Sequence, residues 1–184
     1  MGQPGGCTYR TVTLSSPGGS NPRAMVLHKA MDQNFMADRP YPEKLRQILE
    51  DLRFFTEPTD MHEYLIDLAD RFQEVPERIA KRPFAEEHRV PFCESQAFVW
   101  AEQQPDRTLK FYFAVENPQG ISAKALSVIL DESLSGLPPE EIVKVPTDIV
   151  LEIFGRNISM GKGQGLMGIV NMVKSLAQKF ISDK

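Results

Sequence analysis

Cys93 is the residue best placed to do chemistry, because it is the one cysteine in the part of the chain that shows helix and strand periodicity. The chain has two cysteines, and Cys7 lies in a Gly- and Pro-rich N-terminal stretch, whereas Cys93 does not. Cys93 follows Pro91-Phe92 and precedes a segment of strand character, so we expect it on a turn that enters a sheet edge. Cysteine reacts as its thiolate, and exposure and nearby charge decide whether it does so. Cys93 is therefore a candidate reactive thiol, and the competing interpretation is a small buried apolar residue.

Charged and basic side chains near this thiol would tune its reactivity. Arg89 and Lys162 would favour the thiolate if the fold brings them close, and Glu94 would disfavour it. A cysteine hydrolase would need a base within reach of the thiol. His88 is close to the cysteine in sequence, while His62 lies on a predicted helix and would approach only through the fold. A cysteine hydrolase therefore stays open as a lesser alternative.

The composition argues against several other classes of function. The chain of 184 residues has a formal net charge of -4, and an acidic chain is a poor general binder of nucleic acid. No apolar run reaches the roughly 18–20 residues of a membrane helix, and no N-terminal apolar segment indicates a secretory signal. Two cysteines cannot build a disulfide framework, and with three histidines they leave a zinc site short of ligands. We therefore expect a cytoplasmic protein that binds no metal.

The first 38 residues differ in composition from the rest. Gly, Pro, Ser and Thr dominate up to Pro22, and no acidic residue occurs before Asp32. Such a composition is typical of a disordered tail. A basic, hydroxylated segment without acids is also found in transit peptides, which would place the protein in a plastid stroma or a mitochondrial matrix. We predict a tail over residues 1–38 and one domain over residues 39–184.

Hydrophobic periodicity predicts helices on both sides of a small sheet. Apolar residues recur at helical spacing in several segments, and Asp60 is the expected N-cap of the second helix. The predicted helices cover residues 42–55, 61–73, 122–134, a short segment from 139, 148–154 and the C-terminal stretch. The C-terminal helix has the clearest apolar stripe, which consists of Leu166, Ile169, Val170, Val173, Leu176, Ala177 and Phe180.

Two strands are predicted between these helices, over residues 97–102 and 109–116. The second alternates strictly, with apolar residues at every other position on one face, and residues 104–107 are typical of a hairpin turn. If Gln103 pairs with Thr108, four aromatic rings share one face of the sheet, namely Phe98, Trp100, Phe111 and Phe113. A short strand at residues 89–90 would complete a three-stranded antiparallel sheet. The order of helices, sheet and helices predicts an α+β domain.

The glycines of residues 163–168 match the G-x-G-x-x-G pattern of dinucleotide-binding proteins. That fingerprint requires a preceding strand and a βαβ unit, and the few residues after Gly168 are predicted to form only the final helix. We therefore set nucleotide binding aside. The glycines are instead expected to form a turn and to allow close helix packing.

The segment around Cys93 resembles the active-cysteine segment of the SufE family of sulfur acceptors. Residues 90–99 read V-P-F-C-E-S-Q-A-F-V, and the family pattern is V-x-G-C-x-S-x-V-W/Y. Cys93 takes the position of the family cysteine and Ser95 that of its serine. Gln96 matches a common glutamine and Phe98 the aromatic residue. Shorter matches keep the family's order between residues 45 and 181, at 60–75, 124–126, 139–143 and 159–166.

Three positions depart from the family pattern, and one of them is Gln119, where the family commonly has an acidic residue. Phe92 stands where the family usually has glycine, and glycine permits backbone conformations that phenylalanine does not. Lys162 stands where the family has arginine, which keeps the charge but loses the bidentate guanidinium. The departure at Phe92 bears on how freely the cysteine loop can move.

The resemblance implies a function as well as a SufE-like fold. Cys93 would take sulfur as a persulfide from a SufS-like, pyridoxal-phosphate-dependent cysteine desulfurase, activate that enzyme, and pass the sulfur to an iron–sulfur scaffold protein. The chain would need no cofactor of its own, because pyridoxal phosphate belongs to the desulfurase. An apolar pocket that includes Phe92 and Phe98 would shelter the persulfide. The competing class is a non-catalytic interaction module in which Cys93 only fills space.

Overall fold

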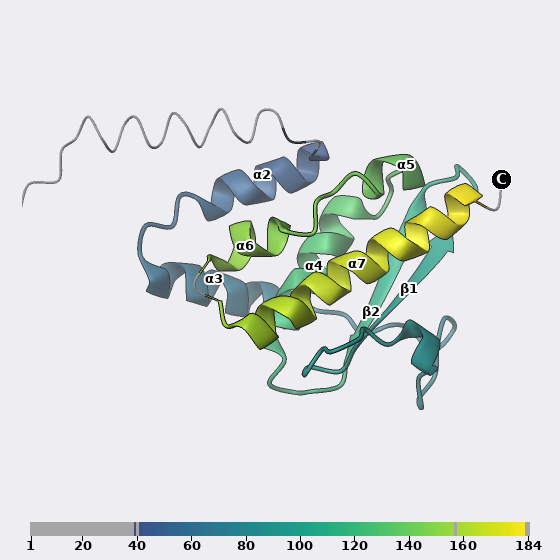
Figure 1. The fold of residues 1–184 in the computed structure, drawn as a ribbon, viewed down its shortest axis with the longest axis horizontal. Helices are drawn as coiled ribbons and strands as arrows, with labels where there is room; N and C mark the ends of the chain where they lie inside the picture. Colours follow the sequence, from purple (N-terminus) through teal and green to yellow (C-terminus); the bar gives the residue numbers. More distant parts are fainter. Residues whose placement is uncertain (1–38, 40, 157, 183–184) are drawn as a thin grey trace, which may run out of the picture. The chain divides into compact units, whose positions relative to one another are not determined.

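The protein is described by a computed structural model that covers residues 39, 41–156 and 158–182. Within these residues, helices pack against one face of a small antiparallel sheet, which confirms the predicted α+β class (Figure 1). In chain order the elements are α2 (Glu43–Leu52), α3 (Pro58–Asp70), the 3-10 turn η1 (Glu86–His88), β1 (Ala97–Gln103), β2 (Leu109–Val115), α4 (Ile121–Leu134), α5 (Pro139–Ile142), α6 (Ile149–Phe154) and α7 (Met160–Ser182).

Helix α4 is the most buried helix of the domain. It contacts α2, α3, α7 and strand β2, so its apolar residues face neighbours on most sides. The four side chains that the periodicity directed inward are all at most 1% exposed; they are Leu126, Ile129, Leu130 and Leu134. Even Ser127 and Ser133 are buried there, and each hydroxyl donates to the carbonyl four residues earlier. This helix supports the sheet from the side on which α7 also lies.

The start of helix α3 differs from the prediction. The helix begins at Pro58, with Glu57 as its N-cap residue, so Asp60 lies inside the first turn and does not cap it. Proline is favoured at this first position because its missing N–H would be unpaired there in any case, and its fixed φ suits a helix. The proline therefore sets the helix start, and the capping-box prediction at Asp60 was wrong.

The register of the hairpin differs from the prediction by one residue. Gln103 pairs with Leu109, not with Thr108. The turn holds three residues, because the Gln104 N–H donates to the Thr108 carbonyl at 2.8 Å and the Arg107 N–H donates to the Gln104 carbonyl at 2.9 Å. Arg107 has a φ of 68°, the left-handed conformation that closes a three-residue hairpin loop.

This shift divides the aromatic residues between the two faces of the sheet, since a slip of one residue reverses which face a side chain occupies. Phe98 and Trp100 pair with Ala114 and Tyr112, and these four residues define the outer face. The outer face is covered by the segment that contains Val75, Ile79, Ala80 and Phe84. Phe111 and Phe113 lie on the opposite, inner face, where α4 and α7 contact the strands. The predicted cluster of four rings on one face was therefore wrong.

A third full strand is not found among the described residues, where the sheet has two strands. Arg89 forms an isolated antiparallel bridge with Phe98, and the Val90 N–H donates to the Ala97 carbonyl at 2.8 Å. The pairing predicted at residues 89–90 thus exists, but it ends after one bridge. The chain then leaves the sheet edge as the cysteine loop.

Helix α7 crosses the sheet as the long C-terminal element (Figure 1). Its stripe is confirmed, since Leu166, Ile169, Val170, Val173 and Ala177 are buried, while Leu176 and Phe180 are half-buried. The glycines of the G-x-G-x-x-G pattern lie inside the helix and do not form the turn that we expected. In the part of the chain that the structure describes, neither α7 nor any other helix has the length and apolar character needed to span a bilayer.

Candidate functional site

Cys93 lies in a loop that leaves and re-enters one edge of the sheet. The Arg89–Phe98 bridge closes the loop at its base, and the loop itself consists of residues 91–96. At its tip the Gln96 N–H donates to the Cys93 carbonyl at 3.0 Å, which forms a tight turn. Gln96 has a φ of 50°, so the chain reverses there before β1 begins. The cysteine therefore lies on a turn that enters a sheet edge, as predicted.

The C-terminal half of the loop is held by backbone hydrogen bonds from the segment after β2. The Asn117 N–H donates to the Ser95 carbonyl and the Glu116 N–H to the Gln96 carbonyl, each at 3.2 Å. Gly120 makes this approach possible, because a Cβ atom there would lie 3.1 Å from the Ser95 Cβ and 2.7 Å from a methyl group of Val115. Ser95 and Gln96 therefore act through their backbone to fix the loop.

The N-terminal half of the loop rests on glycines of helix α7. A Cβ atom at Gly165 would lie 3.3 Å from the Cys93 Cα and 3.6 Å from its Sγ. A Cβ atom at Gly168 would lie 2.8 Å from a methyl group of Val90 and 3.3 Å from the Pro91 carbonyl. Gly165 and Gly168 thus let the loop backbone approach the helix closely. The cysteine is sheltered by the surface of α7.

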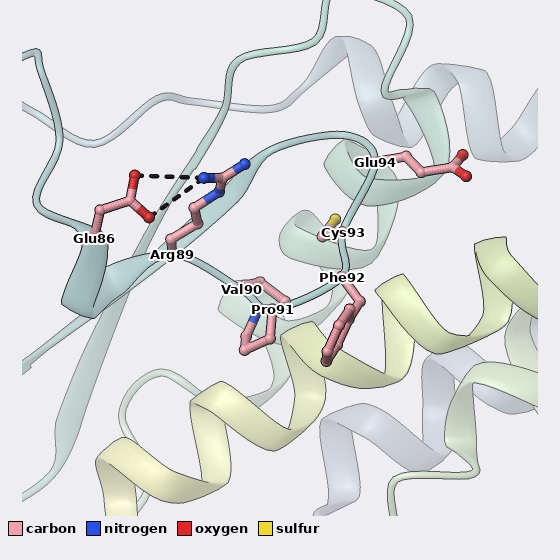
Figure 2. A pocket seen from close by; sticks show the side chains of 7 residues that line it. All are labelled: Glu86, Arg89, Val90, Pro91, Phe92, Cys93 and Glu94. Atoms are coloured by element: carbon pink, nitrogen blue, oxygen red, sulfur yellow. Dashed lines mark hydrogen bonds and ion pairs between the residues drawn. The ribbon is translucent and has the colours of Figure 1, made fainter.

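Cys93 is 8% exposed, although both of its neighbours are exposed. It lines a pocket of about 580 Å³ together with Glu86, Arg89, Val90, Pro91, Phe92 and Glu94. Figure 2 shows its sulfur on the inner side of the loop's arc, while the Phe92 ring projects in the opposite direction. Among the described residues it is the one free cysteine. The thiol is thus covered at rest and yet belongs to the surface of a pocket.

Phe92 has an unusual backbone and an unusual exposure. Its φ is 57°, in the left-handed region that a bulky residue rarely adopts, and its side chain is 91% exposed. The position therefore has the backbone conformation for which glycine is best suited, in agreement with the glycine of the family pattern. Phe92 lines the pocket, but its ring does not enclose the sulfur.

The charges near the loop do not converge on the thiol. Arg89 pairs with Glu86, whose carboxylate lies 3.3 Å from the guanidinium, and Figure 2 shows both on the side of the loop away from Glu94. Glu94 is exposed and extends toward the start of α7, with Oε1 3.7 Å from the place of a Cβ on Gly161. Lys162 is exposed on the first turn of α7. Two of the three charged side chains that line the pocket of Cys93 thus pair with each other, and the third extends toward α7.

Phe98 lies apart from the cysteine, on the outer face of the sheet. Its ring packs against Phe84 at 5.2 Å and Trp100 at 6.1 Å between centroids. It is 4% exposed and does not line the pocket of Cys93. Its role is to hold β1 against the segment that precedes the loop, so the prediction that it shelters the sulfur was wrong.

His88 and His62 were the two candidate catalytic bases, and neither is paired with Cys93 in the structure. The Nδ1 atom of His88 lies 3.0 Å from the Val99 carbonyl and its Nε2 atom 3.4 Å from the Glu87 carboxylate. Its ring also packs against Trp100, at 5.2 Å between centroids. His62 is exposed on α3. The arrangement lacks the thiol–imidazole pair on which a cysteine hydrolase depends.

Gly165 and Gly168 are the site residues that sequence reasoning missed. The G-x-G-x-x-G pattern drew attention to them as residues of a turn and of close helix packing, but not as the contacts of the cysteine loop. Their spacing of three along a helix places them on one face, which was a usable signal. No group of three or more potential metal-binding side chains occurs among residues 39–182, leaving aside 40 and 157.

Comparison with known proteins places this arrangement in context. The model of the SufE family, described as an Fe-S metabolism associated domain, matches residues 46–177. A protein of Plasmodium vivax named "Cysteine desulfuration protein SufE" is 28% identical over 102 residues, which is 55% of this chain and 42% of that protein. The chain thus aligns with less than half the length of this relative.

Two further matches cover more of their length. An uncharacterized SufE-like protein of Synechocystis is 26% identical over 149 residues, 79% of this chain and 87% of that protein. The solution structure of a hypothetical protein from Thermus thermophilus matches with a TM-score of 0.60 and 25% identity, over 77% of this chain and 98% of the other. The α+β domain is therefore a fold already seen in a solved structure.

Proposed function

The chain belongs to the SufE family, and from this we propose that Cys93 accepts sulfur as a persulfide from a cysteine desulfurase and delivers it to iron–sulfur cluster assembly. The observation that carries the proposal is the setting of the thiol. Cys93 is sheltered against α7, yet it lies in a surface loop and lines a pocket. A sulfur carrier needs both properties, because its cargo must be protected in transit and reached at each end.

The transfer step is a thiol–disulfide type of exchange. The Cys93 thiolate attacks the terminal sulfur of the donor's persulfide, a new S–S bond forms on Cys93, and the bond to the donor's cysteine breaks. The donor's cysteine leaves as a thiolate, so no external oxidant or reductant is consumed. Delivery repeats the exchange in the other direction, with a thiol of the recipient attacking the persulfide on Cys93.

The anchoring of the loop supports access to the thiol. Hydrogen bonds hold its base at Val90 and its C-terminal half at Ser95 and Gln96. Cys93 itself contacts α7 at Gly165, where van der Waals contact can be exchanged for contact with a partner at small cost. The thiol can therefore become exposed without unfolding of the sheet or of α7.

The desulfurase would bring the pyridoxal phosphate that releases sulfur from free cysteine. The described part of this chain supplies only the acceptor thiol and its shelter. Contact with the acceptor would draw sulfur off the desulfurase and so raise its turnover. The recipient would be an iron–sulfur scaffold protein or an intermediate carrier with an accessible thiol.

The decisive experiment follows labelled sulfur. The protein is incubated with a SufS-type cysteine desulfurase and sulfur-labelled cysteine without reductant, and the label is located by intact mass and peptide mapping. We expect one or more added sulfur atoms on Cys93 and increased desulfurase turnover. Cys93→Ser should fold normally, because the two side chains have similar volume, but should carry no label and give no stimulation.

The remaining outcomes discriminate between the alternatives. Cys7→Ser is the matched control and should accept sulfur like the wild type. Wild-type protein that carries no label and leaves desulfurase turnover unchanged would contradict the proposal and favour a non-catalytic interaction module. Hydrolysis of esters or peptides by the isolated protein would favour the cysteine hydrolase, although the position of His88 gives that activity no support.

A further inference from the structure

Phe92 combines two unfavourable features, a left-handed backbone and an exposed aromatic ring, and its ring is not buried in the domain. Its backbone is in the left-handed region, at a φ of 57°, and its ring is 91% exposed to water. Among the described residues, Phe54 and Met160 are the other large apolar side chains with such exposure, at 80% and 79%. Strain of this kind persists at functional sites when a residue is needed in that place.

We propose that Phe92 is the anchor by which the sulfur donor recognises this protein, and that its ring enters an apolar pocket next to the donor's persulfide cysteine. The inference rests on the proposed function, because it takes the donor to be a cysteine desulfurase. It adds a specificity-determining residue to that function and assigns the ring a partner of defined chemistry.

The geometry of the transfer decides what covers Phe92. The donor's sulfur must come within about 3–3.5 Å of the Cys93 Sγ for the exchange to occur. Consecutive Cα atoms are about 3.8 Å apart, and Phe92 lines the same pocket as Cys93. A protein that brings its sulfur to Cys93 must therefore also cover the residue before it. The ring and the sulfur point to opposite sides of the loop (Figure 2), but a partner protein buries about 800 Å² on its side of an interface, which is wide enough to cover both sides of this loop.

The surroundings of Phe92 have the anatomy of a binding surface. Pro91 and Phe92 are exposed and provide an apolar centre, and the charged residues of the pocket flank it. These charged residues are Glu86, Arg89 and Glu94. An aromatic centre within a polar rim is typical of the small cluster of residues that contributes most of the binding energy in protein interfaces. A glycine in place of Phe92 would give the loop its preferred backbone but would leave this centre without its largest group.

The test measures binding of the full chain to the desulfurase that delivers sulfur to wild-type Cys93 in the labelling experiment. Affinity is measured by calorimetry in the absence of free cysteine for wild type, Phe92→Ala, Phe92→Tyr and Phe54→Ala. We expect Phe92→Ala to weaken binding on the order of 10- to 100-fold, as loss of an aromatic anchor does, and Phe92→Tyr to restore most of it. Phe54→Ala is the matched control, an exposed phenylalanine on the α2–α3 connection, and should change affinity by no more than about twofold.

Sulfur transfer gives a second, independent readout. For Phe92→Ala we expect a higher half-saturating concentration and an almost unchanged maximal rate, because the reacting thiol is intact. Equal affinities of Phe92→Ala and wild type would overturn the anchor and leave the proposed function standing. A wild-type protein that accepts no sulfur would instead contradict the proposed function itself. A loss in Phe54→Ala as large as that in Phe92→Ala would also reject the anchor, since the effect would then reflect general surface hydrophobicity.

Discussion

Two neighbouring residues of the cysteine loop have opposite relations to solvent. Cys93 is 8% exposed and Phe92 is 91% exposed, although they are adjacent in the chain. The backbone at Phe92 is in the left-handed region, and the two side chains project to opposite sides of the loop (Figure 2). The Cys93 side chain lies against α7 at Gly165, while the Phe92 ring is exposed to water.

Phe92→Gly should stabilise the domain slightly or leave its stability unchanged. A non-glycine residue in the left-handed region costs about 1–2 kcal/mol, which glycine avoids, while the added freedom of glycine in the unfolded chain costs about 0.5–1 kcal/mol. The net expectation is a gain of about 0–1.5 kcal/mol in the free energy of unfolding, measured by urea denaturation. A clear loss of stability would mean that the ring packs on the domain in solution. The same variant should bind the desulfurase less tightly, so stability and affinity change in opposite directions.

At the scale of elements, the contact between the cysteine loop and α7 determines the site. The two are far apart in sequence, and they meet because α7 carries glycine where the loop backbone arrives. Gly165 faces Cys93 and Gly168 faces Val90 and Pro91. Glycine in a helix interior costs about 1 kcal/mol relative to alanine, so its use here is explained by the close approach that it permits.

Gly168→Ala should destabilise the protein despite the better helix propensity of alanine. Its Cβ would lie 2.8 Å from a methyl group of Val90, which is 1% exposed and has little room to move. Overpacking of this kind costs about 1–3 kcal/mol. The matched control is Gly161→Ala on the same helix, where the nearest atom is a flexible carboxylate oxygen at 3.7 Å. Urea denaturation should show a loss for the first variant and no loss for the second; equal stabilities would argue against close loop packing on α7.

The hairpin turn supplies a pH-dependent contribution at the same scale. The Asp106 carboxylate accepts hydrogen bonds from the Thr108 hydroxyl at 2.7 Å and from the Thr108 N–H at 3.0 Å. These bonds, the hydroxyl first, hold the pKa of Asp106 below its ordinary value. A lowered pKa in the folded state means that this stabilisation is complete above the unfolded-state pKa and is lost as the pH falls through the folded-state value.

Asp106→Asn should therefore remove part of the acid sensitivity of the fold. We expect the variant to be less stable than wild type near pH 7. The difference should shrink as the pH falls below about 4, because Asp106 of the unfolded chain then binds a proton and the folded carboxyl follows at lower pH. Thermal unfolding over a pH series measures this difference. A difference that stays constant with pH would show that the charge of Asp106 is not what stabilises the turn.

At the scale of the whole molecule, α4 ties the helices to the sheet. It contacts α2, α3, α7 and β2, so a defect in its packing should be felt throughout the domain. The only tryptophan, Trp100, lies on the outer face of the sheet, packed against Phe84 and His88. Its fluorescence reports on that face, while circular dichroism reports on the helices. The two signals together test whether the domain unfolds as one unit.

Ile129→Ala is the variant that tests this unity. Ile129 is fully buried on α4, and truncation of a buried isoleucine to alanine costs about 2–5 kcal/mol because a cavity remains. Both signals should shift to the same lower urea midpoint. Ile66→Ala, a partly exposed isoleucine on α3, is the control and should shift them less. Midpoints that separate in Ile129→Ala would show that the sheet and the helices unfold independently.

Local patterns were sufficient to predict the helices, the two strands and the position of the cysteine. The stripes of α4 and α7 repeat with the period of a helix, and burial of one face requires that period in any fold. The order of helices and strands then predicted the α+β class, and the residues around Cys93 were enough to suggest the SufE family. These features depend on residues that are close together in the chain.

Only the tertiary structure decided the features that depend on distant contacts or on one backbone angle. The hairpin register follows from the left-handed conformation of Arg107, which is one of several allowed choices for that turn. That choice placed Phe98 on the outer face and away from the thiol. The shelter of Cys93 comes from Gly165, a residue far along the chain whose meaning appears only when α7 lies against the loop. The spacing of residues in a sequence does not predict which face of a helix contacts which loop, because that orientation depends on how the whole core packs.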